Sequence, residues 1–291
     1  MATGEVQQVE VAGRTLRVSS LDKVLYPATG TTKAEVLAYY LQTADRILEQ
    51  LRDRPVTRIR WPHGVTGAHF FEKNLPSGAP EWLSSVAIRG HRSRAGRDDG
   101  VVTYPLVHDV AALVYLVNLG SLELHVPQWR VDQDGQPRLP DRMVIDLDPG
   151  PGVGLTTCAQ VALLVREQMT GAGLQVHPVT SGSKGMQVYA GLDGERTADE
   201  VSAVAKALAQ HLTERHPDLV LWRMTKSLRA GKIFLDWSQN SAAKTTICPW
   251  SLRGRETPCV ATPRTWDEVQ DAADGTREMT QVLLTDALTR T

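Results

Sequence analysis

The sequence predicts a mixed α/β (α+β) fold, because segments with the apolar period of strands alternate along the chain with segments that have the period of helices. A length of 291 residues with 42% apolar content is enough for a sizeable core. Neither an internal repeat nor a convincing linker interrupts the pattern, so we expect one domain over residues 1–291. The irregular order of the elements gives no support to a doubly wound parallel sheet.

Sequence patterns in the first part of the chain predict two helices and three strands. A helix over 32–51 opens with the capping-box pair Thr32 and Glu35, and apolar residues follow at three- and four-residue steps. Strand patterns cover 56–62, 101–107 and 121–126, and a helix is expected over 109–120.

The second part begins with the apolar segment 141–148, which ends at Pro149-Gly150 and predicts a buried strand. A helix is expected over 156–170, and a long helix over 197–215 opens with a second capping box, Thr197 to Glu200. Strand patterns cover 174–180, 185–192, 219–224 and 232–237, and a short helix begins near Trp266.

Charge and composition exclude several classes of protein. The net charge is −1, so a nucleic-acid-binding role would need local positive patches. One such patch is the segment RGHRSRAGR at 89–97, which is either an exposed loop or, as we favour, a basic arm on DNA phosphates. No apolar run is long enough for a membrane span and no secretory signal is visible, so we expect a cytoplasmic protein. The three cysteines have no zinc-type spacing.

Two acids close the predicted strand 141–148. Asp146 and Asp148 are two residues apart and face the same side of the strand, where they repel each other unless a cation lies between them. The alternative is a simple Asp-Pro-Gly turn in which Asp148 caps the backbone. Asp236 ends another apolar run. If its strand lies beside the first, three carboxylates meet at one site for Mg²⁺ or Mn²⁺.

Small and basic residues suggest a phosphate-binding region. The segment TSGSKGMQVY at 180–189 joins two predicted strands and offers Ser181, Ser183 and Lys184 as donors. The alternative is an ordinary Gly/Ser hairpin turn. Cations also flank Asp236, as expected where a metal ion and a polyphosphate share a pocket, although charged segments are usually only solvated surface. These cations are Arg229, Lys232, Lys244, Arg253 and Arg255.

Together these segments resemble a known family. MVIDLDPG, TSGSKGMQVY, KIFLDWSQN and KTTICPWSLRGR occur in the order found in the polymerase domain of bacterial ligase D type, a member of the archaeo-eukaryotic primase superfamily. The resemblance extends upstream through LDKVLYP, HFFEKNLP and NLGSLELHVPQW, so it covers nearly the whole chain. It implies a primase-polymerase fold with two β-sheets, flanking helices and an RRM-like catalytic sheet, in a monomeric protein of the bacterial nucleoid.

The resemblance also implies roles for individual residues. Two Mn²⁺ or Mg²⁺ ions would be bound by Asp146, Asp148 and Asp236. The incoming nucleotide would be held by His125, Ser181, Ser183, Lys184, Gln187, Arg229, Lys244 and Arg253. A DNA 5′-phosphate would be bound by Lys23 and Lys33, and template DNA by Phe70, Phe71, Arg92 and Arg94.

The residues by themselves leave other readings open. His125 could be a hydrogen-bonded structural histidine, Lys23 and Lys33 ordinary surface lysines, and Phe70-Phe71 one core residue with an exposed neighbour. Gln187 stands where the superfamily motif usually has His. A glutamine can donate to a phosphate oxygen but carries no charge.

The implied function is a nucleotidyltransferase that binds DNA ends and extends primer 3′ ends. It would act with or without a template, prefer ribonucleotides, and serve non-homologous end joining or gap filling. Implied partners are DNA ends or gapped DNA with a 5′-phosphate, NTP or dNTP, a Ku-type protein and an ATP-dependent DNA ligase. No ligase motif is present, so the chain is either a stand-alone enzyme or an excised domain.

Three rival functions remain. The first is a stand-alone primase-polymerase that acts in other repair or in replication. The second is a non-catalytic DNA-end-binding module whose acids hold a structural cation. In such a module a nucleotide pocket would have no use. The third, a metal-dependent nuclease, leaves the Gly/Ser-Lys turn without a reason.

Overall fold

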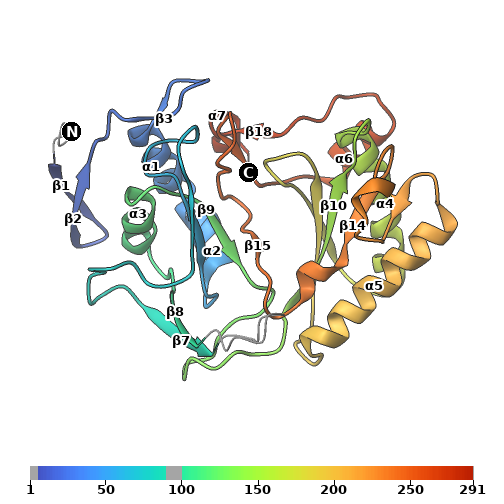
Figure 1. Cartoon of the computed structure of the whole chain (residues 1–291), viewed down its shortest axis with the longest axis horizontal. Coiled ribbons are helices and arrows are strands. Elements are labelled where there is room, and N and C mark those ends of the chain that lie inside the picture. Colours follow the sequence, from blue (N-terminus) through green and yellow to red (C-terminus); the bar gives the residue numbers. More distant parts are fainter. Residues whose placement is uncertain (1–5, 90–99, 291) are drawn as a thin grey trace.

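Two β-sheets lie one in each half of the molecule (Figure 1), and their strands carry all three candidate acids. The computed structural model describes residues 6–89 and 100–290. The mixed α/β class, with helices flanking two sheets, is confirmed. No helix within the described residues is both long and apolar enough to cross a membrane.

The N-terminal half is built around a four-stranded antiparallel sheet. Its strand order is β15 (Thr246–Ile247), β9 (Ser121–Val126), β5 (Thr57–Arg60) and β6 (Phe70–Glu72). Three helices contribute to the same apolar core, namely α1 (Lys33–Gln42), α2 (Ala44–Leu51) and α3 (Val110–Asn118). In this core Leu122 and Leu124 of β9 are fully buried, so Glu123 and His125 between and after them face the other side.

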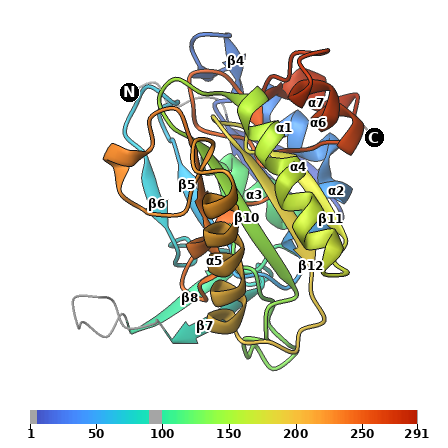
Figure 2. The same cartoon turned by 90° about the vertical axis from the view of Figure 1, so that its right-hand side faces the viewer.

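The second half is built around a six-stranded sheet. Its order is β13 (Val220–Leu221), β14 (Ile233–Asp236), β10 (Arg142–Pro149), β12 (Met186–Gly191), β11 (Val176–Thr180) and β17 (Thr262–Pro263). Among the described strands of this sheet, only β13 and β14 pair in parallel. Figure 2 shows α4 (Leu155–Gly171) and α5 (Ala198–Arg215) covering one face. Met143, Ile145 and Leu147 of β10 pack in this core, which leaves the opposite face for the site.

Smaller elements complete the chain. Two-stranded sheets are formed by β1 (Val6–Val11) with β2 (Arg14–Ser19), β3 (Val24–Tyr26) with β4 (Thr31–Thr32), β7 (Ser85–Arg89) with β8 (Val101–Pro105), and β16 (Cys259–Val260) with β18 (Val282–Leu283). Short helices are α6 (Trp266–Ala273), α7 (Leu284–Leu288), and the 3₁₀ turns η1 (Lys226–Leu228) and η2 (Trp237–Asn240).

Most expected elements are confirmed, including both capping boxes at Thr32 and Thr197. The single helix expected over 32–51 is wrong, because the chain breaks at Thr43. The Thr43 hydroxyl and amide both donate to the carbonyl of Tyr39, at 2.8 and 3.0 Å, and such back-bonding competes with regular helix bonding.

Two further expectations need correction. The strand expected over 219–224 is only Val220–Leu221, because Trp222 O accepts from Trp237 Nε1 at 3.3 Å instead of continuing the ladder. The β1–β2 hairpin was not expected. Its turn is Ala12-Gly13, with φ of 48° and 75°, the left-handed pair that suits a tight hairpin.

A charge network ties α6 to the end of the chain. Glu268 accepts from Arg264 at 3.2 Å, from Arg290 at 2.6 Å and from the Thr265 amide at 2.9 Å. Burial alone would raise the pKa of the Glu268 carboxyl. The donors from Arg290, Thr265 and Arg264 outweigh burial and lower the pKa to about 2.

We therefore expect Glu268 to stabilise the fold in a pH-dependent way. Its folded-state pKa lies below the ordinary value of 4.5, so its contribution is present above that pH and is lost as the pH falls towards about 2. Urea unfolding of wild type and Glu268→Gln at decreasing pH should show a difference in unfolding free energy that shrinks over this range. A difference that stays constant would contradict the network.

Candidate active site

The register of the large sheet brings the expected acids together. Strand β10 lies between β12 and β14, and its Asp146 is paired with Gln187 on one side and with Asp236 on the other. Directly opposed residues of neighbouring strands point to the same face. The expectation that the strand of Asp236 lies beside that of Asp146 is therefore confirmed.

The carboxylates of Asp146 and Asp148 are only partly compensated by nearby positive charge. Asp146 accepts one hydrogen bond from Gln187 Nε2 at 3.1 Å, and Asp148 lies 4.0 Å from Arg229. Burial, with the nearby charge of Asp148, raises the pKa of Asp146 to about 8. Burial, with the charge of Asp236, also raises the pKa of Asp148. A bound cation would relieve both penalties.

The carboxylate of Asp236 is held by the turn that follows it. Its Oδ1 accepts from the amide and hydroxyl of Ser238, and its Oδ2 accepts from Gln239 at 2.9 Å and lies 3.9 Å from Lys244. Within the described part of the chain, no group of three or more His, Cys, Asp or Glu side chains is arranged to hold a metal ion. The strands meet as expected, whereas the three carboxylates are not gathered around one point.

The loop between β11 and β12 is shaped by glycine and by a distant glutamine. Gly182 has φ +69°, and a Cβ there would lie 2.6 Å from Arg253 Cγ. Gln281 accepts from the Gly182 amide at 2.7 Å and donates to the Gly185 carbonyl at 3.0 Å. The loop is therefore a braced turn that presents the exposed Lys184 beside the acids.

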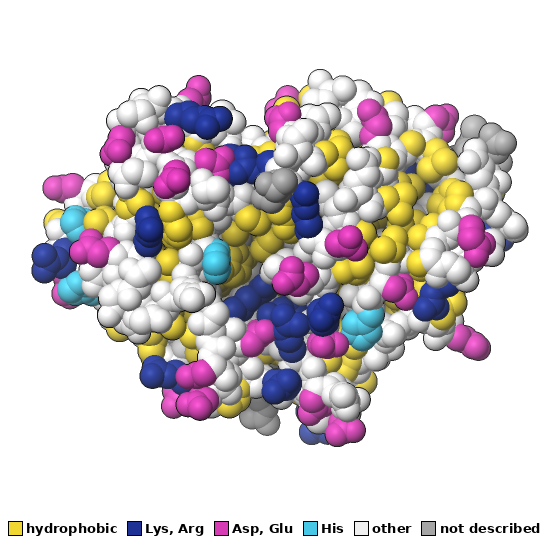
Figure 3. Space-filling view, turned by 180° about the vertical axis from the view of Figure 1, so that it is seen from behind, with side chains coloured by type: hydrophobic (Ala, Val, Ile, Leu, Met, Phe, Trp, Pro, Cys, Tyr) yellow, Lys and Arg dark blue, Asp and Glu magenta, His cyan; other side chains and the backbone are white. Residues whose placement is uncertain are grey.

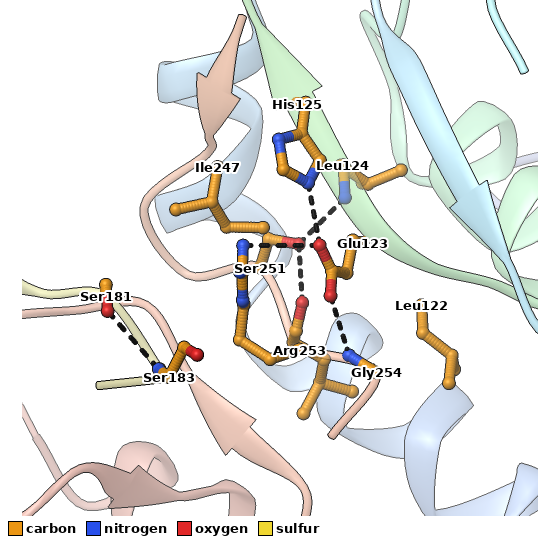
Figure 4. Close-up of polar contacts among 12 residues, drawn as sticks. Leu122, Glu123, Leu124, His125, Ser181, Ser183, Ile247, Ser251, Arg253 and Gly254 are labelled. Carbon is orange, nitrogen blue, oxygen red and sulfur yellow. Dashed lines mark hydrogen bonds and ion pairs between the residues drawn. The ribbon is translucent and has the colours of Figure 1, made fainter. Parts of the chain in front are cut away.

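A buried carboxylate organises the opposite wall (Figure 4). Glu123 accepts from His125 at 2.8 Å and from the Gly254 amide at 2.9 Å, and it forms an ion pair with Arg253 at 3.2 Å. Burial alone would raise the pKa of Glu123, but His125 and Arg253 hold it below its usual value. His125 is thus the hydrogen-bonded histidine that the sequence left open, and its ring also lines the cavity.

These walls enclose a cavity of about 390 Å³. Residues from both halves of the molecule line it. The candidates among them are His125, Asp146, Asp148, Ser181, Ser183, Lys184, Gln187 and Arg253. Asp236, Arg229 and Lys244 do not belong to this lining, although Arg229 and Lys244 lie next to the acids. Figure 3 shows Lys and Arg side chains gathered near the middle of one face, with Asp and Glu side chains among them.

A second cavity of about 630 Å³ shares His125 with the first and is lined by Phe71, Lys73, Trp129 and Lys244 among others. Phe70 and Phe71 are 50% and 59% exposed, so neither is the core residue that strand alternation alone suggested. The edge strand β6 leaves both rings free to contact a ligand. Arg92 and Arg94 lie outside the described residues.

Lys23 and Lys33 meet at a separate pocket of about 150 Å³. Lys33 donates to Ser19 O at 2.7 Å and Lys23 to Pro62 O at 3.2 Å. Lys33 is buried, so it is not the ordinary surface lysine considered above. Burial and the neighbouring charge of Lys23 lower the pKa of Lys33 to about 8, a penalty that a bound anion would remove.

Sequence reasoning missed several residues that support the site. Glu123 carries a signal, because it stands two residues before His125 in an alternating strand and so shares its face. Gln281 and Ser238 carry none, because their contacts depend on long-range folding or on a local turn. Gly254 was also missed; a Cβ there would lie 2.2 Å from the Trp61 ring.

Two sheets with flanking helices, and an acid pair on a central strand beside a cationic cavity, define the class of primase-polymerase domains. Residues 32–290 match the family described as "LigD, primase-polymerase domain", and the chain belongs to this family. The polymerase domain of Mycobacterium tuberculosis ligase D, solved in complex with DNA, is similar with a TM-score of 0.87 and 44% identity. The match covers 94% of this chain and 93% of that one.

Full-length relatives are longer than this chain. The multifunctional non-homologous end joining protein LigD of Mycolicibacterium smegmatis is 51% identical over 88% of this chain and 32% of its own length. The bifunctional non-homologous end joining protein LigD of Bacillus subtilis is 33% identical over 88% of this chain and 40% of its own. The chain therefore spans about a third of the first of these relatives and two fifths of the second.

Proposed function

We propose that this chain is a nucleotidyltransferase that binds DNA ends and extends primer 3′ ends in non-homologous end joining or gap filling. It adds nucleotides with or without a template and prefers ribonucleotides, as the family resemblance implies. The observation that carries the proposal is the Asp146–Asp148 pair, which lies at the floor of a cavity with Lys184 and Arg253 in its walls. An acid pair beside such cations suits a metal-bound polyphosphate.

The nucleotide side of the proposal rests on donors without partners. Arg253 Nε and Arg229 Nε are buried and have no hydrogen-bond partner within the described residues. A buried unpaired donor is costly, and a phosphate oxygen would satisfy it. Lys184, Ser181 and Ser183 line the same cavity as Arg253 and would bind the other phosphate oxygens. His125 also lines it, whereas Lys244 lies outside this lining, 3.9 Å from Asp236.

The residues fit a divalent metal ion. Asp146 and Asp148 supply hard oxygen ligands whose ionisation is opposed by burial and by the charges of neighbouring carboxylates. Asp236 would join them by exchanging its contacts with Ser238 and Gln239. When bound, two Mg²⁺ or Mn²⁺ ions would activate the primer 3′-hydroxyl and neutralise charge on the departing pyrophosphate. The role of Gln187 is to donate to Asp146 and orient its carboxylate.

The DNA side of the proposal rests on two further surfaces. Lys23 and Lys33 would bind the 5′-phosphate across a gap, and the exposed rings of Phe70 and Phe71 would stack on template bases. Both halves of the chain line the nucleotide cavity, which supports a single functional domain. By analogy with the end-joining relatives, a Ku-type protein and an ATP-dependent ligase are the proposed partners.

The decisive experiment is primer extension on a gapped duplex with each nucleotide type, in Mn²⁺ and in Mg²⁺. Wild type should extend the primer, with faster extension when the gap carries a 5′-phosphate than a 5′-hydroxyl. Asp148→Ala should lose extension by at least about a hundredfold, since the metal site loses a ligand. Asp45→Ala, an exposed acid on α2, is the matched control and should extend normally.

Each outcome separates the proposal from a rival. Products made without any primer would favour a primase, and shortened DNA would favour a nuclease. Tight binding of DNA ends with no extension by wild type would favour the non-catalytic module. Normal extension by Asp148→Ala would contradict the assigned metal site.

Gln187→His should change the KM for the nucleotide and leave extension intact. Gln187 contacts Asp146 and accepts from the Tyr189 hydroxyl at 2.8 Å, so a histidine would alter the charge beside the acid without removing an acid. Steady-state kinetics at varied nucleotide concentration give the KM and kcat separately. An inactive but folded variant would show that Gln187 has a role which the superfamily's usual residue cannot supply here.

A further inference from the structure

We propose that Glu123 is a positioning residue that fixes His125 and Arg253 as one unit in the wall of the nucleotide pocket. The inference rests on the proposed function, because it assigns Glu123 an effect on nucleotide binding. Neither the acid pair nor the phosphate-binding loop includes Glu123, and its carboxylate is too deeply buried to be an ordinary surface acid, with only 5% of the side chain exposed.

One carboxylate serves three donors from two segments of the chain. Oε2 accepts from His125 Nε2 and forms an ion pair with Arg253 Nη1, and Oε1 accepts from the Gly254 amide (Figure 4). Glu123 and His125 belong to β9, whereas Arg253 and Gly254 follow β15. Removing the charge of this buried carboxylate would leave the groups that contact it without their ionised partner, which is costly in a buried site.

The carboxylate fixes which nitrogen of His125 carries hydrogen. An ionised carboxylate can only accept, so His125 Nε2 must donate to it. The other nitrogen, Nδ1, then remains for groups that enter the cavity, and in the neutral ring it is an acceptor. Glu123 thereby sets both the orientation of the ring and the chemistry that the ring presents.

Arg253 is fixed along its length by the same arrangement. Its amide donates to Cys259 O at 2.9 Å, and its carbonyl accepts from the Tyr26 hydroxyl at 2.8 Å. Glu123 holds Nη1, and Gly182 packs against Cγ without room for a Cβ. The guanidinium therefore keeps Nη1 against Glu123, while Nε has no hydrogen-bond partner within the described residues. A phosphate oxygen entering the pocket could accept a hydrogen bond from this unpaired Nε.

The test compares Glu123→Gln with wild type by calorimetric titration of ATP with Mg²⁺ and by primer-extension kinetics. Glu123→Gln keeps the shape but removes the charge, so we expect ATP to bind about tenfold more weakly, with KM raised similarly and kcat changed much less. Asp141→Asn is the matched control. Asp141 also pairs with two arginines, Arg54 and Arg130, each at 2.7 Å, but does not line the cavity.

Asp141→Asn should lower the melting temperature and leave ATP affinity unchanged. If the role of Glu123 were purely structural, Glu123→Gln would show this same pattern. In the His125→Ala background, Glu123→Gln should weaken ATP binding by a smaller factor than it does in wild type, because part of its effect passes through His125. Wild-type ATP affinity in a folded Glu123→Gln protein would overturn the proposal. If that variant does not fold, Glu123→Asp takes its place, with the carboxylate drawn back from its donors.

A spectroscopic measurement is independent of any activity. Long-range ¹H–¹⁵N correlation of the His125 ring in wild type should show hydrogen on Nε2, and Glu123→Gln should lose this fixed tautomer. A wild-type ring with hydrogen on Nδ1 alone would overturn the proposal. If wild type bound no nucleotide, the proposed function would fail. If wild type and Glu123→Gln bound nucleotide with equal affinity, the role of Glu123 would be contradicted and the proposed function would remain.

Discussion

The site depends on the antiparallel pairing of β10 with β12 and β14. This register places Asp146 between Gln187 and Asp236, and the alternation along β10 sends Leu147 into the core while Asp146 and Asp148 face the cavity. A shift of one residue would bury the acids and expose the apolar residues, so the packing of α4 and α5 on the sheet also fixes the site. Stability and function share one strand.

Positive charge is arranged around these acids without neutralising them. Arg229 reaches only 4.0 Å from Asp148, Lys244 contacts Asp236, and Arg253 is held by Glu123. Asp146 and Asp148 therefore retain raised pKa values, which a bound metal ion, as proposed above, would lower. Glu123 pairs with Arg253 in the opposite wall, and in the proposal above this pairing keeps the guanidinium available to a phosphate.

Sequence reasoning predicted what local pattern determines and missed what tertiary contacts determine. The capping boxes and the strand β10 follow from local sequence pattern and periodicity. The cost of burying a lone acid only suggested that Asp236 lies near the pair, and the register of β10 with β14, which pairs it with Asp146, came from the fold. The helix break at Thr43 and the hold of Ser238 on Asp236 depend on single hydroxyl groups that no period reveals. Gln281 is a hundred residues or so from the loop that it braces, so only the fold could identify it.

We propose that Asp146 and Asp148 bind divalent metal ions and that Asp236 leaves its turn to join them. Anomalous diffraction from crystals soaked in Mn²⁺ would locate the bound ions. We expect a peak in contact with Asp146 and Asp148, and an Asp236 carboxylate that has left Ser238 to reach it. Well-ordered crystals with no peak at the pair, or with manganese bound only elsewhere, would show that these acids are not the metal ligands.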